Sequence, residues 1–174
     1  MLKDLAWPKK GNKAFVPAPD GKAFHLRAIT WRPQQYAAAF HRTAAMVIDT
    51  CQDEEGSPRS DELFLPVAYL YRHSLELRMK DIIVTGLGLQ FFRFEEVDKS
   101  LQQHNLARLW THAKKLLVDR WPTADQTPLK AVEAIINEFH QADPNGQVFR
   151  YDTDKDGNRH RYTSLPDHIS LAEL

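Results

Sequence analysis

The stretch from Tyr69 to Ile83, YLYRHSLELRMKDII, combines charged side chains with an apolar helical repeat. Arg72, Glu76 and Lys80 recur at every fourth residue, which places one acid between two bases on a single face of a helix. Most of the other positions are apolar, and an unpaired charge beside them would be costly. The spacing therefore predicts either an ion ladder on a half-exposed face or a polar pocket in which Glu76 orients a basic partner such as His104.

Histidine and arginine are the side chains that suit metal-independent RNA cleavage. That reaction needs a base for the 2′-hydroxyl, an acid for the leaving oxygen and a cation on the phosphate. Histidine titrates near neutral pH, and a guanidinium can hold two phosphate oxygens at once. Arg161 and His168 could meet this need, as could a cluster of His73, His104 and Arg150. For Arg161 and His168, a solvated pair at a turn is the simpler interpretation.

A phosphate bound near the 69–83 stretch is expected to contact Arg72 and Arg150. His73 is instead interpreted as a satisfied histidine at the edge of the core. Arg150 belongs to the segment 147–163, QVFRYDTDKDGNRHRYT, where basic and aromatic residues alternate in a way that could stack on bases and hold phosphates. Because three aspartates offset most of its positive charge, the segment is better interpreted as an ordinary exposed hairpin.

No metal ion or other cofactor is expected from the sequence. Asp152, Asp154, Asp156 and Gly157 match the start of a calcium-binding loop, but the twelfth position is Thr163 rather than a bidentate glutamate. A tight hairpin turn explains the same residues. The eight histidines show no zinc-ligand spacing on a common helix face.

The elements that must position these side chains are predicted to be helices, and the fold class is all-α. Apolar spacing, prolines at helix starts and breaker residues at helix ends predict helices over 33–54, from about 61 to the Gly86-Leu87-Gly88 break, over 105–121 and over 127–142. Pro66 is expected to kink the second helix, and 87–104 to form an irregular connection or a short helix.

The two ends of the chain are predicted to be less regular. Prolines and glycines interrupt residues 1–32, which we expect to form an irregular N-terminal arm that docks on a helical domain over 33–174. A small β-hairpin around Asp156-Gly157 should precede a last, short helix that begins near Pro166. The predicted architecture is a bundle of four or five helices.

Length, charge and cysteine content limit the possible functions. At 174 residues the chain can bury one core, and 23 basic against 23 acidic residues leave no net charge to attract nucleic acid or anionic lipid from a distance. Any nucleic-acid contact must therefore be local. The single Cys51 suits a reducing cytosol, and no apolar run has the length of a signal peptide or a membrane span. We expect a cytoplasmic protein without membrane contact.

Three strings, spread over residues 60–174, resemble the higher eukaryotes and prokaryotes nucleotide-binding (HEPN) superfamily. They are Arg72-His73-x-x-Glu76-Leu77-x-x-Lys80, His104-Asn105-Leu106-x-x-Leu109 and Phe149-Arg150-Tyr151. The resemblance implies a compact, often dimeric helical bundle of the kind found in RNA-cleaving toxins, in their noncatalytic relatives and in defence or stress systems. Active members share an Arg, four to six residues, then His motif near the last helix, which forms a metal-independent ribonuclease across a dimer. Arg161 and His168 have this spacing, with Pro166 between them.

The expected function is that of an RNA- or nucleotide-associated HEPN-like domain of a bacterial stress or defence system, catalytically weak or inactive. Two alternatives stay open. One is an active metal-independent endoribonuclease that uses Arg161 and His168, and the other is a non-enzymatic scaffold for a cognate partner protein. The sequence therefore leaves open whether the protein is an enzyme. A homodimer is expected, because the apolar stripes and the short last helix leave surface that needs covering.

Overall fold

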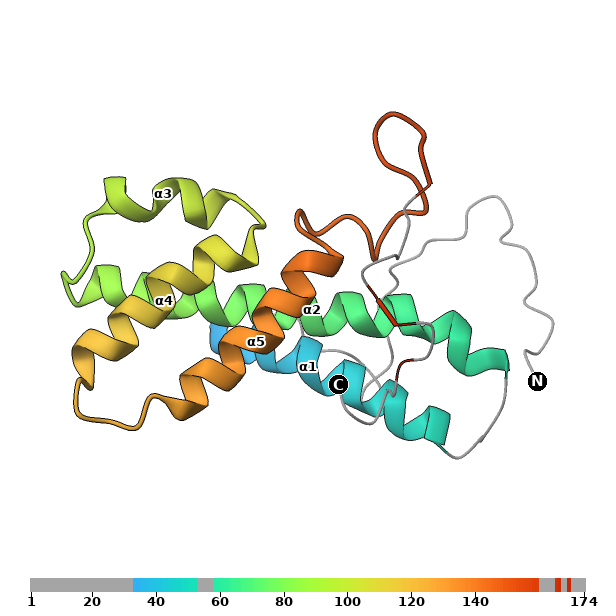
Figure 1. Cartoon of the computed structure of the whole chain (residues 1–174), viewed down its shortest axis with the longest axis horizontal. Coiled ribbons are helices and arrows are strands. Elements are labelled where there is room, and N and C mark those ends of the chain that lie inside the picture. Colours follow the sequence, from blue (N-terminus) through green and yellow to red (C-terminus); the bar gives the residue numbers. More distant parts are fainter. Residues whose placement is uncertain (1–32, 53–57, 160–164, 167–168, 170–174) are drawn as a thin grey trace, which may run out of the picture. The chain divides into compact units, whose positions relative to one another are not determined.

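The computed structural model describes residues 33–52, 58–159, 165, 166 and 169 (Figure 1). The chain divides into two units, Met1–Thr30 and Trp31–Leu174, and every described residue belongs to the second. The predicted arm over 1–32 lies outside the described residues, as do Arg161 and His168.

Five helices make up the described part of the chain, in agreement with the predicted all-α class. They are α1 (Pro33–Gln52), α2 (Pro58–Gly88), α3 (Phe94–Gln102), α4 (Leu106–Arg120) and α5 (Thr127–Ala142). Pro33 begins α1 and Pro128 lies in the first turn of α5, where the missing N–H of proline leaves no hydrogen bond unmade. The side chain of Asn105 caps α4 by accepting a hydrogen bond from the backbone N–H of Arg108 at 2.9 Å.

The long helix α2 is the element against which the others are arranged (Figure 1). Helix α1 packs along α2, α4 packs against α2, and α5 packs against α4. The short α3 contacts α4 and α2. Helix α2 continues through Pro66 rather than ending there. Because α2 contacts three other helices, its side chains can reach several parts of the fold.

Two apolar clusters hold the described helices together. The smaller one joins α1 to the first half of α2 through Ala44, Ile48, Val67 and Tyr71. The larger one joins the second half of α2 to α3, α4 and α5, and its buried members are Met79, Ile83, Phe92, Val97, Leu106, Leu109, Trp110, Ala113, Leu116 and Ile136. Arg72 and Glu76 of α2 lie between Tyr71 of the smaller cluster and Met79, the first buried residue of the larger one.

The predicted β-hairpin is not confirmed, since the described residues contain no strand. One isolated antiparallel bridge joins Thr153 to Arg159 around a turn in which Gly157 has a φ of 80°. The Asp154 side chain accepts hydrogen bonds from the backbone N–H groups of Asp156 and Asn158, both at 2.9 Å. These hydrogen bonds close the turn, and they explain the presence of Asp154 at this position without a bound calcium ion. None of the described helices has the length and apolar character needed to cross a membrane.

Candidate functional site

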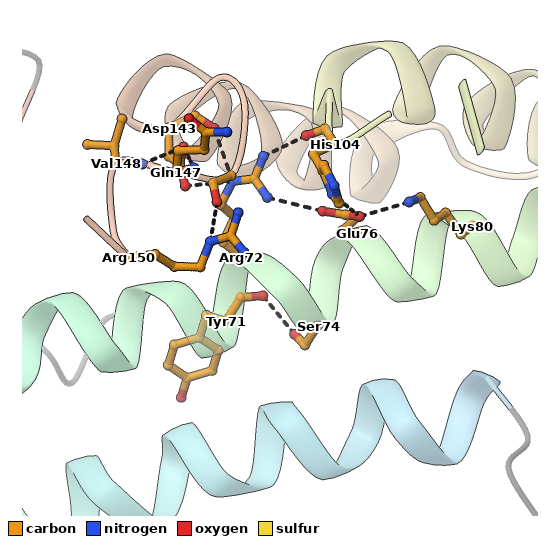
Figure 2. Close-up of polar contacts among 11 residues, drawn as sticks. Tyr71, Arg72, Ser74, Glu76, Lys80, His104, Asp143, Gln147, Val148 and Arg150 are labelled. Carbon is orange, nitrogen blue, oxygen red and sulfur yellow. Dashed lines mark hydrogen bonds and ion pairs between the residues drawn. The ribbon is translucent and has the colours of Figure 1, made fainter. Parts of the chain in front are cut away.

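Arg72 is a buried arginine that joins three segments of the chain (Figure 2). Its side chain is 1% exposed. Within its own helix, Nη1 donates to Oε2 of Glu76 at 3.2 Å. From the α3–α4 connection, the carbonyl oxygen of His104 accepts from Nη2 at 2.6 Å, and directly after α5 the carbonyl oxygen of Asp143 accepts from Nε at 3.0 Å. One guanidinium thus ties α2 to two connections that are distant in the sequence.

Asp143 continues this network into the segment that follows α5. Its carboxylate is fully buried, and Oδ2 lies 3.2 Å from Nε of Arg72 as an ion pair without a hydrogen bond. The other oxygen, Oδ1, accepts hydrogen bonds from the backbone N–H groups of Gln147 at 2.7 Å and Val148 at 3.1 Å. Two backbone donors and one guanidinium therefore compensate this buried charge.

Gly146 lets the same segment approach Arg72 closely. It has a φ of 72°, and a Cβ added there would lie 2.9 Å from Nη1 of Arg72. Its carbonyl oxygen accepts a hydrogen bond from Nε of Arg150 at 2.6 Å. Only glycine combines this backbone conformation with this short distance, so Gly146 also fixes the position from which Arg150 reaches the site.

Glu76 is a buried carboxylate shared by three basic groups. It is 2% exposed, and Oε1 lies 2.8 Å from both Nζ of Lys80 and Nδ1 of His104. Burial by itself would raise the pKa of Glu76, but the hydrogen bonds and charges of Lys80 and His104 outweigh it and lower the pKa. Glu76 is therefore ionised at neutral pH. The arrangement is a polar network around a buried carboxylate, shared with His104, and not a half-exposed ion ladder; we call it the pocket of Glu76.

The basic partners of Glu76 remain accessible to solvent. The side chain of His104 is 54% exposed and that of Lys80 is 22% exposed, against 3% for Glu76. If Nδ1 of His104 donates to the ionised carboxylate, Nε2 is the ring nitrogen left to take up a proton or bind a ligand. Because the buried acids lie beneath solvent-accessible bases, the side of the site that faces solvent is positively charged.

Aromatic side chains border the pocket. The ring of His73 stacks on Tyr69 with centroids 5.7 Å apart and an interplanar angle of 9°, and it meets Phe40 of α1 edge to face at 4.5 Å. Burial lowers the pKa of His73, so the ring is neutral at neutral pH. The Arg150 guanidinium lies over the rings of Tyr69 and Tyr151, at 5.5 Å and 5.4 Å from their centroids.

The structure gathers most of the predicted ligand-binding residues, although in different roles. Four of them form the network itself, namely Arg72, Glu76, Lys80 and His104. His73 turns toward α1, and Arg150 joins through Gly146. The sequence argument missed the roles of Asp143 and Gly146, because the string Asp143-Pro144-Asn145-Gly146 was interpreted only as breaker residues at the end of the predicted helix over 127–142. No three metal-ligating side chains come together in the described part of the chain.

Comparisons of the chain with protein-family models, with curated proteins and with solved structures gave no match. The case for a function therefore depends on the side chains of the site and on the sequence resemblance.

Proposed function

We propose that this chain is an RNA- or nucleotide-associated HEPN-like domain of a bacterial stress or defence system, with weak or no catalytic activity. In this proposal phosphate groups of the ligand bind to the exposed side of the pocket, at Lys80 and His104 and, toward the other end, at Arg150. The observation that carries it is the layering of the site, in which solvent-accessible bases cover buried, ionised acids.

The charges of the site favour an anionic ligand. The cations Arg72, Lys80 and Arg150 outnumber the carboxylates Glu76 and Asp143, so one positive charge remains when His104 is neutral and two when it is protonated. Because the whole chain has no net charge, this excess is a local feature. A local excess of positive charge suits a ligand with one or a few phosphates.

Arg72 serves the framework of the site in this proposal and does not contact the ligand. Three of its N–H groups already donate to protein acceptors, and its side chain has almost no contact with solvent. A phosphate could reach it only by displacing Glu76 or the backbone carbonyl groups. The expected phosphate contact of Arg72 is therefore transferred to Lys80 and His104, while Arg150 keeps its expected role.

A ligand-binding experiment tests this proposal. We expect a panel of nucleotides and short RNAs to contain ligands that raise the melting temperature of the wild-type protein, since a ligand at 100 times its Kd adds about 2.7 kcal/mol to the free energy of unfolding. Lys80→Gln and His104→Gln should abolish the shift. Lys130→Gln and His41→Gln, which alter exposed residues of α5 and α1, are the matched controls. No shift with any member of the panel would favour the protein scaffold instead.

Weak catalysis is part of the proposal, because acid–base cleavage needs a base and an acid together. In the described pocket only one imidazole, that of His104, is exposed, since His73 packs against Phe40. We expect total RNA incubated in chelator with wild-type protein or with an Arg161→Ala/His168→Ala variant to remain equally intact. Faster loss of RNA with the wild-type protein would establish the ribonuclease alternative.

A further inference from the structure

Four side chains form a stacked row beside the phosphate site, in the order Tyr151, Arg150, Tyr69 and His73. The Arg150 guanidinium lies over both tyrosine rings, and the Tyr69 ring is parallel to that of His73. The row begins on the segment after α5 and continues on α2, and the pocket of Glu76 follows it along the same helix. Figure 2 shows Arg150 next to Arg72 at one end of this pocket, with His104 and Lys80 toward the other.

The helical spacing places the row and the pocket next to each other along α2. Tyr69, His73, Glu76 and Lys80 are separated by four, three and four residues, which keeps them on one face of α2. At a rise of 1.5 Å per residue, Tyr69 and Lys80 lie about 17 Å apart along the helix axis. A stacked strand advances about 3.4 Å per nucleotide, so this distance corresponds to about five nucleotides. The surface is longer than a single nucleotide requires.

Packing in the core explains the positions of His73 and Tyr69 in this row, but not those of Arg150 and Tyr151. His73 is half-buried against Phe40 of α1, and the half-buried Tyr69 stacks on His73, as expected of residues at the edge of a core. Tyr151, in contrast, is 54% exposed, and Arg150 is exposed, with its terminal nitrogens meeting no acceptor in the described part of the chain. A planar cation fixed beneath an exposed ring presents a flat, π-rich surface, to which nucleobases bind by stacking.

The charges around Tyr151 show which part of a nucleotide this end accepts. The adjoining turn, residues 152–159, contains three aspartates and two bases, Lys155 and Arg159. Its net charge is therefore negative, which disfavours a phosphate placed beside it. The phosphate-binding cations lie on the other side of Arg150, toward Lys80 and His104. The Tyr151 end therefore suits a base, and the pocket suits the phosphates of the same ligand.

We propose that Tyr151 and Arg150, backed by Tyr69, form a stacking site for an unpaired nucleobase of a short RNA strand whose phosphates lie on Lys80 and His104. The inference rests on the proposed function and adds to it the ligand class, a single strand of several nucleotides. A paired base is excluded from this site because both of its faces are covered within a duplex.

Fluorescence anisotropy with a labelled eight-nucleotide RNA, and with an abasic strand of the same length, tests the stacking site. Base stacking on one aromatic side chain changes affinity by about 5- to 150-fold, so we expect Tyr151→Ala to weaken RNA binding by about tenfold or more. Tyr151→Trp should retain the affinity because it keeps a ring. Trp121→Ala, which removes a ring with 55% exposure at the end of α4, should have no effect.

The abasic strand separates failure of this inference from failure of the proposed function. It should bind more weakly than RNA, lose affinity in Lys80→Gln, and be indifferent to Tyr151→Ala. Equal binding of RNA to wild type and Tyr151→Ala, or equal binding of duplex and single-stranded RNA, would overturn the stacking site while the phosphate site stands. If neither strand binds the wild-type protein, the stacking site fails, and the proposed function fails as well when no nucleotide raises the melting temperature.

Discussion

Arg72 stabilises the fold by compensating two carboxylates that water barely reaches. Glu76 is 2% exposed and Asp143 is 0% exposed, and removing one partner from a buried ion pair costs about 3–5 kcal/mol because the remaining charge is unpaired. We expect Arg72→Met to lower the free energy of unfolding by about this amount in urea denaturation. Lys115→Met, which breaks the exposed pair with Asp119, should cost less than about 1 kcal/mol. Equal losses in the two variants would contradict the role given to Arg72.

Glu76 makes stability depend on pH in the acid range. Its folded pKa is lowered below that of an unfolded glutamate, so its contribution is fully present above about pH 4.3 and is lost as the pH falls through the folded pKa. Urea midpoints of the wild-type protein should decline through this range, and in Glu76→Gln the decline should be shallower. Glu138→Gln, at an exposed position of α5, is the control. Parallel pH profiles for wild type and Glu76→Gln would show that Glu76 is not the titrating group.

Three half-buried histidines act at higher pH than Glu76. Burial lowers the pKa of His73, His112 and His140, so the folded state binds their protons less well than the unfolded chain. Their contribution is complete above the usual histidine value of about 6.5 and is lost as the pH falls through their folded pKa values. The charge of Glu76 raises the pKa of His73 and partly offsets the effect of burial, so Glu76→Gln should lower the pKa of His73 further. The contributions of His112 and His140 should be the same in both proteins, which urea midpoints between about pH 5 and 7 would show.

At the scale of elements, the connection after α5 positions both Asp143 and Arg150, and its two glycines can be compared directly. Gly146 and Gly157 have φ values of 72° and 80°, but an added Cβ meets Arg72 at 2.9 Å in the first case and no atom within 4 Å in the second. Alanine in the left-handed region costs about 1–2 kcal/mol at either position. Urea denaturation should show a larger loss for Gly146→Ala, because that variant also displaces the guanidinium. Equal losses in the two variants would mean that the Arg72 side chain moves away from the added Cβ without a loss of stability.

The sequence predicted the helices well where local signals mark their ends. The predicted helix over 127–142 matches α5, and α4 lies within the predicted 105–121, because Pro128, Asn105 and Pro122 act on the backbone beside them. The start of α2 was placed near Asp61, whereas the helix begins at Pro58. Proline is compatible with both a loop and the first residue of a helix, and the sequence alone did not distinguish the two.

The site was predictable only as far as a single helix determines it. Spacing on α2 placed Arg72, Glu76 and Lys80 on one face, and the structure keeps them there. The roles of Asp143 and Gly146 depend on how the segment after α5 folds back onto α2, which is a tertiary arrangement without periodicity in the sequence. The predicted hairpin also depended on pairing between segments, and only the bridge from Thr153 to Arg159 formed among the described residues.

For the whole molecule, the homodimer stays a prediction that the exposed apolar side chains of the described helices motivate. Met46, Phe94 and Ile135 are 69%, 59% and 50% exposed, and apolar surface of this kind is a common site of subunit contact. We expect light scattering during size-exclusion chromatography to give twice the 20.1 kDa mass of the chain. A species of 20.1 kDa at all protein concentrations would reject the dimer.

The balance of charge over the whole chain predicts a shallow salt dependence for RNA binding. With 23 basic and 23 acidic residues, the chain has no net charge that would add to the phosphate contacts at Lys80, His104 and Arg150. Each phosphate contact on a single strand contributes about −0.7 to the slope of log K against log salt concentration, so three contacts give about −2. Anisotropy titrations between 50 and 200 mM salt should then show a loss of RNA affinity of about twentyfold.

Arg150→Gln should reduce the slope to about −1.4, and Lys130→Gln should leave it unchanged. A wild-type slope steeper than about −5 would require many more phosphate contacts than this pocket can make, and would place the main RNA contact elsewhere on the protein.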